Sequence, residues 1–119
     1  MTFKKTFSLF LSFSILFCQK DININSLVKM DDTFIIKGEE LPANCIVFQL
    51  KSGKKEIMGN LKNGKKNGIW IEWHNYGRRL QETYKNGVLD GFVSIYYMNG
   101  QKEWRHTYNN GVLEGNYTR

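Results

Sequence analysis

The C-terminal half of the chain repeats one pattern about every two dozen residues. Each copy has an Asn-Gly pair, a second glycine four residues after the first, and then aromatic or β-branched residues. Gly64 and Gly87 are 23 residues apart, Gly87 and Gly111 are 24 apart, and Gly77 and Gly100 are again 23 apart. A spacing that holds at two independent markers predicts stacked copies of one small supersecondary unit. The glycines expected in these repeat turns are Gly64, Gly68, Gly77, Gly87, Gly91, Gly100, Gly111 and Gly115.

The residues of each copy favour β-hairpins. Four Asn-Gly pairs, which end at Gly64, Gly87, Gly100 and Gly111, are flanked by strand-forming residues and supply the positive φ of tight hairpin turns. The next glycine of each unit precedes an expected strand, where a missing side chain permits a bulge. The expected strands are 69–74, 80–84, 92–97, 104–108 and 116–117. The sequence therefore predicts an all-β chain, an antiparallel meander of hairpins.

Two segments carry a resemblance to a known family. Gly68-Ile69-Trp70-Ile71-Glu72-Trp73 and Gly91-Phe92-Val93-Ser94-Ile95-Tyr96 are similar to the bacterial variant of the MORN repeat, over residues 46–119. The resemblance implies a MORN-type single-layer sheet and no particular reaction. Bacterial proteins that look like this are often labelled the antitoxin component of a toxin-antitoxin module, which implies a toxin as the partner.

The expected strands place apolar side chains on both faces of the sheet. In 69–74, Ile69, Ile71 and Trp73 point one way, while Trp70, Glu72 and His74 point the other. A sheet that is apolar on both sides is either covered or offers a surface to a partner. The candidate binding residues on the less apolar face are Glu72, His74 and Tyr97.

The N-terminus has the layout of a secretory signal. Lys4 and Lys5 precede an uncharged apolar run at 6–17, which is followed by Cys18. As a helix the run covers roughly 18 Å, short of the ~30 Å hydrocarbon core, which favours a cleaved segment over a membrane span. The layout resembles a bacterial lipoprotein signal, which implies lipidation of Cys18, although Phe17 stands where such signals have a small residue. Ordinary secretion, an uncleaved anchor and a cytosolic protein remain the alternatives.

The organisation of the remaining chain follows from these assignments. We assign a signal peptide, forming a helix, to 1–17, a polar tether to 18–33, pre-repeat strands with an eroded first unit to 34–57, and the repeats to 58–119. Gly53 precedes Gly64 by 11 residues, as Gly100 precedes Gly111, which supports the eroded unit. Cys45 lies in an apolar segment and is expected to be a buried thiol. A bridge to Cys18 is the alternative in an unlipidated form.

Motifs of catalysis are missing from the sequence. Neither His74 nor His106 has a further ligand at metal spacing, and no nucleophile elbow or phosphate-binding glycine loop is present. Asp90 and Glu114 occupy equivalent positions in successive copies, as expected of solvated structural residues. We therefore expect no catalytic residue, cofactor or metal, and a protein that is not an enzyme.

The formal charge of +6 bears on the choice of partner. Lysines interleave with aromatic residues in the first repeats, but they lie mostly in turns, where solubility explains them, and export separates the chain from nucleic acid. An anionic lipid surface suits the same charges better. The sequence thus predicts an exported, membrane-anchored lipoprotein of the cell envelope, a non-catalytic repeat protein that binds or scaffolds a protein partner. The alternative is an antitoxin or immunity-like protein that neutralises a toxin.

Overall fold

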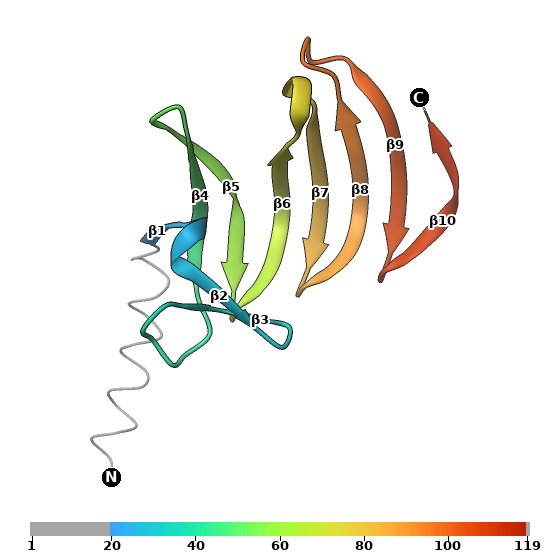
Figure 1. The fold of residues 1–119 in the computed structure, drawn as a ribbon. Coiled ribbons are helices and arrows are strands. Elements are labelled where there is room, and N and C mark those ends of the chain that lie inside the picture. Colours follow the sequence, from blue (N-terminus) through green and yellow to red (C-terminus); the bar gives the residue numbers. More distant parts are fainter. Residues whose placement is uncertain (1–19, 119) are drawn as a thin grey trace.

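The computed structural model describes residues 20–118, which form a mostly β chain (Figure 1). Eight strands make one sheet in the order β1-β4-β5-β6-β7-β8-β9-β10, and β2 pairs with β3 in a separate hairpin. This confirms the prediction of a sheet built from antiparallel hairpins. The expected signal peptide, its helix and the lipidation residue Cys18 lie outside the described residues.

Consecutive strands from β4 to β10 are antiparallel neighbours. Their bounds are Cys45–Lys51 for β4, Lys54–Lys62 for β5, Lys65–Trp73 for β6, Arg79–Lys85 for β7, Val88–Tyr96 for β8, Lys102–Asn109 for β9 and Val112–Thr118 for β10. The short 3₁₀ turn η2, Asn75–Gly77, joins β6 to β7. Alternate strands therefore begin directly after an Asn-Gly turn, and each second glycine lies inside a strand rather than before it.

The turn glycines adopt the backbone that only glycine takes without strain. Gly64, Gly87 and Gly111 have φ of 77°, 84° and 84°, and the asparagine before each also has positive φ, as a two-residue hairpin turn requires. The fourth pair differs, because positive φ occurs at Gly100 but not at Asn99. There the Gly100 N–H donates to the Tyr97 carbonyl, which closes a four-residue turn with glycine in its last position.

The second glycine of each unit accompanies an irregularity of the sheet. Gly68 and Gly91 have φ of 88° and 123°. The register between β7 and β8 shifts between the pairs Glu82↔Val93 and Tyr84↔Leu89, which bracket Gly91. The register between β9 and β10 shifts between Leu113 and Tyr117, which bracket Gly115. Gly91 and Gly115 therefore lie in β-bulges.

Backbone hydrogen bonds connect the turn of each unit to the unit before it. The Gly87 N–H donates to the Lys66 carbonyl at 2.8 Å, and the Gly111 N–H donates to the Leu89 carbonyl at 2.7 Å. The Gly64 N–H makes the same bond to Ala43 at 2.7 Å. Residues Ala43, Lys66 and Leu89 thus occupy equivalent positions in successive units, and the arrangement extends back to the start of β4.

The segment assigned to a tether is folded from residue 20 onward. Strand β1, Lys20–Asn23, pairs in parallel with β4, the 3₁₀ turn η1 spans Ile24–Ser26, and β2, Leu27–Met30, pairs with β3, Thr33–Ile36. Apolar residues in this segment alternate with polar ones, so its overall polarity concealed one apolar face. In Figure 1 these elements lie beside and across β4 and β5, away from β7 to β10.

This N-terminal segment covers the main hydrophobic core. The buried cluster consists of Ala43, Cys45, Val47, Leu61 and Trp70, and Ile22, Ile24, Leu27, Phe34, Ile36, Met58 and Tyr84 pack against it. Of the buried cluster, Cys45, Val47, Leu61 and Trp70 lie on one face of β4, β5 and β6, and Ala43 precedes β4. The same face carries Glu72. Among residues 20–118, β7, β8 and β9 make their extensive contacts only with neighbouring strands of the sheet.

Candidate functional site

The three expected binding residues lie at one end of the sheet. Glu72 is near the end of β6, His74 follows that strand, and Tyr97 follows β8, and all three are exposed. The register aligns Glu72 with Leu80 on β7, and Leu80 with Ile95 on β8. Glu72 therefore has aliphatic neighbours on β7 and β8 in its row.

The opposite face carries a denser group of recognition residues, which we call the arginine–aromatic face. One cross-strand row joins Trp73, Arg79 and Tyr96, and a second joins Gln81, Ser94 and Arg105. Because directly paired residues share a face, these rows lie on the same side of the sheet. Together with Ile69 and Phe92, the residues that define the face are Ile69, Trp73, Arg79, Phe92, Tyr96 and Arg105.

Both arginines of this face stack on aromatic rings. The Arg79 guanidinium carbon lies 4.5 Å from the Tyr96 ring centroid and 6.0 Å from that of Trp73. The Arg105 guanidinium carbon lies 4.2 Å from the Phe92 centroid, and its Nε donates to the Ser94 hydroxyl at 3.4 Å. Such contacts hold long side chains in one orientation, so part of the entropy cost of binding is already met.

Large apolar side chains of the same face remain in contact with solvent. Ile69 is 54% exposed and Phe92 is 50% exposed, although both lie within strands at the middle of the sheet. Nε1 of Trp73 and Nε of Arg79 are buried without an acceptor among the described residues. Exposed apolar area and unmet polar atoms both cost free energy in the isolated chain. The arginine–aromatic face therefore contributes little to the stability of the isolated chain and is suited to contact with a partner.

The sequence analysis placed its candidate binding residues on the face of Glu72. Alternation along β8 places Phe92 and Tyr96 on one face, but nothing local to the sequence shows which arginine reaches which ring. The contact between Arg105 and Phe92 depends on the register of β9 against β8. Arg105 lies in an expected strand next to the strand of Phe92, whereas Arg79 precedes the expected strand 80–84.

The ionisable side chains of the described residues form no metal site, and two of them have a raised pKa. Within residues 20–118 no three His, Cys, Asp or Glu side chains are grouped so that they could hold a metal ion. Cys45 is fully buried, and burial, with a smaller effect of Glu39, raises the pKa of its thiol. Burial and the carboxylates of Glu82 and Glu72 raise the pKa of the Tyr84 hydroxyl well above its usual range. Both groups stay protonated at neutral pH, which suits structural roles.

Comparison of the chain with protein-family models, with curated proteins and with solved structures gives no match. No helix in the described part of the chain is long and apolar enough to cross a bilayer.

Proposed function

We propose that the chain is a non-catalytic binding or scaffolding module that docks a protein partner on the arginine–aromatic face. The observation that carries the proposal is the pair of arginines stacked on Tyr96 and Phe92, in strands whose extensive contacts among residues 20–118 are with neighbouring strands alone. Arginine and aromatic side chains contribute most to binding energy at protein interfaces. Here they come from three adjacent strands, which hold them in fixed positions.

The sequence supports two further parts of the proposal, a MORN-type sheet and a lipid anchor. The repeat spacing and the two aromatic segments support a MORN-type single-layer sheet. The basic, apolar and cysteine order of residues 1–18 supports export to the cell envelope with lipidation at Cys18. A lipid anchor at that end would leave both faces of β7, β8 and β9 free to meet a partner.

Site-specific photo-crosslinking in the producing cells tests which face binds. A photoreactive phenylalanine analogue replaces Phe92 in one strain and Tyr97 in another, two aromatic residues of similar exposure, 50% and 47%. By strand alternation the two positions belong to opposite faces. We expect one dominant protein adduct from position 92 and little from position 97.

A matched variant separates binding from folding. Arg79→Met keeps the unbranched stem that packs along Trp73 and Tyr96 but removes the guanidinium, so it should abolish the adduct while the thermal unfolding midpoint stays close to native. A dominant adduct from position 97 instead would return the binding site to the face of Glu72 and His74. No adduct from either position would refute docking on the sheet. An adduct with a protein that is harmful in cells lacking this chain would indicate the neutralising role.

A further inference from the structure

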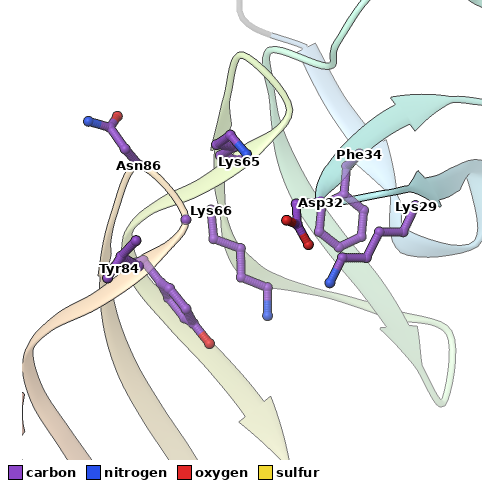
Figure 2. Close-up of a pocket in the computed structure, with 9 residues that line it drawn as sticks. Lys29, Asp32, Phe34, Lys65, Lys66, Tyr84 and Asn86 are labelled. Carbon is purple, nitrogen blue, oxygen red and sulfur yellow. The ribbon is translucent and has the colours of Figure 1, made fainter. Parts of the chain in front are cut away.

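A cavity of about 410 Å³ opens between the β2–β3 hairpin and the turns that begin β6 and β8 (Figure 2). It lies at the opposite end of the sheet from Glu72 and is separate from the arginine–aromatic face. Its principal side chains are Lys29, Asp32 and Phe34 of the hairpin region, Lys65 and Lys66 of β6, and Tyr84 of β7. Its volume is within the range of small-molecule sites.

Two of the lysines interrupt the repeat. Backbone hydrogen bonds from the turn glycines make Lys66 equivalent to Leu89, and the repeat spacing continues to Leu113. The preceding residues are Lys65, Val88 and Val112. Two copies thus have Val-Leu where this copy has Lys-Lys. The repeat fold itself does not require these charges, because the same backbone forms with apolar residues.

Two of the cavity's ammonium groups, those of Lys66 and Lys29, lie against aromatic rings. Nζ of Lys66 lies 4.9 Å from the Trp70 ring centroid and 5.0 Å from that of Tyr84. Nζ of Lys29 lies 5.6 Å from the Phe34 centroid. Figure 2 shows the Lys66 and Lys29 side chains extending into the same space. Among residues 20–118 the ion pairs are Lys55 with Asp21 and Arg78 with Glu103, so the cavity lysines are not neutralised by a carboxylate contact.

We propose that this cavity binds a phosphate ester that carries an aromatic or other flat ring. Three ammonium groups and the Asp32 carboxylate give the lining a formal charge of +2 (3 − 1), which complements a phosphate monoester with a charge of about −1.5 to −2. Lysine binds phosphate as a point charge with three donors, and partial burial strengthens that attraction. The Phe34 and Tyr84 rings supply flat apolar walls for the rest of the ligand. This inference does not depend on the proposed protein partner.

Titration calorimetry of the full chain with phenyl phosphate tests the site. The native chain should bind it saturably, more tightly than inorganic phosphate, and should not bind benzyl alcohol, which has the ring without the phosphate. Lys66→Leu installs the residue of the equivalent position, so the variant should fold, as its circular dichroism spectrum would show. It should weaken binding roughly tenfold or more, the effect of losing one charge-assisted contact.

Lys102→Leu is the matched control, because it removes one charge from an exposed position on β9, far from the cavity. It should bind phenyl phosphate like the native chain. Equal affinity of native and Lys66→Leu would overturn the proposal, as would equal weakening in both variants, which would mean unspecific attraction. Lack of saturable binding by the native chain would overturn it as well.

Vesicle binding distinguishes two sources of such a phosphate, a lipid headgroup and a soluble phosphate ester. We compare the native chain and Lys66→Leu on phosphatidylcholine vesicles with and without phosphatidic acid, since any contribution of residues 1–17 is the same in both chains. Binding to phosphatidic acid that weakens in Lys66→Leu would identify a lipid headgroup. Lys66-dependent binding of phenyl phosphate without a Lys66-dependent effect on vesicles would identify a soluble phosphate ester. Both results support the site.

Discussion

Replacing Gly59 by alanine tests how the core of this sheet is packed. Gly59 lies on β5 beneath the indole of Trp70, and a Cβ atom built on it would overlap the six-membered and five-membered rings, coming within 2.6 Å of Trp70 Cγ. No positive φ is involved at this glycine. The substitution therefore changes packing alone, without backbone strain.

The cost can be worked from three contributions. Forcing the indole from its site costs about 1–3 kcal/mol, as overpacking in well-packed cores does. The hydrogen bond from Trp70 Nε1 to the Asn60 carbonyl, 2.9 Å long, weakens or breaks, which adds about 0.5–1.5 kcal/mol. Alanine also restricts the unfolded chain and returns about 0.4–1 kcal/mol. We expect a net loss of about 2 kcal/mol in the free energy of unfolding.

A double-mutant cycle followed by urea denaturation isolates the clash. Val47 and Val93 are the buried residues 23 positions before and after Trp70, so Trp70→Val installs the side chain of the equivalent positions. In that background Gly59→Ala should be neutral or slightly stabilising, which gives a coupling energy of about 2 kcal/mol. If Gly59→Ala cost the same with valine at position 70, the indole would not be the cause and the packing argument would fail.

Three further predictions concern the turns and the pH dependence. Gly91→Val places a β-branched residue at a φ of 123° and should lower the free energy of unfolding by roughly 1 kcal/mol or more; an unchanged urea midpoint would contradict the bulge. Asn67→Ala removes the side-chain acceptor of the Asn86 N–H, 3.2 Å away, and should cost about 1 kcal/mol in the same assay. Burial raises the pKa of Cys45 above 9.0 and that of Tyr84 above 10.0, so the folded chain retains protons that the unfolded chain releases. Stability should therefore be fully present below pH 9 and fall above it by up to about 1.4 kcal/mol per pH unit for each group, first for the thiol and then for the phenol. Stability that rises between pH 9 and 11 would reverse the sign of the argument, and Cys45→Ala with Tyr84→Phe should flatten the profile.

Sequence patterns within a few residues predicted the hairpin strands, but they did not predict the N-terminal segment that covers β4, β5 and β6. Asn-Gly pairs specify their own turns, so the hairpins at Gly64, Gly87 and Gly111 could be placed without knowledge of any distant contact. The structure of residues 20–33, which the sequence analysis assigned to a tether, was missed because its stabilisation comes from β4, β5 and β6, to which its alternating apolar residues add a second layer. Segments that acquire structure by docking carry weak local signals, since propensity yields to tertiary contacts.

For the candidate sites too, the sequence showed the residue types and the structure showed their arrangement. Exposed aromatic residues were visible in the sequence, but the choice of face was not, because both faces of each strand contain apolar side chains. The structure covers the face of Trp70 on β4, β5 and β6 and leaves Phe92, on the other face, half exposed, which supports the docking proposed there. Lys65 and Lys66 were attributed to solubility in turns, which is the ordinary role of lysine beside an Asn-Gly pair.

The sequence by itself determined the period, the turns and the alternation of side chains, because these depend on backbone preferences within a few residues. Tertiary structure decided the register of β9, which stacks Arg105 on Phe92, and the position of the β2–β3 hairpin, which brings Lys29 and Lys66 to one cavity. These arrangements join residues more than ten positions apart. They arise from which surfaces are buried together when the whole sheet forms, and no local pattern specifies that.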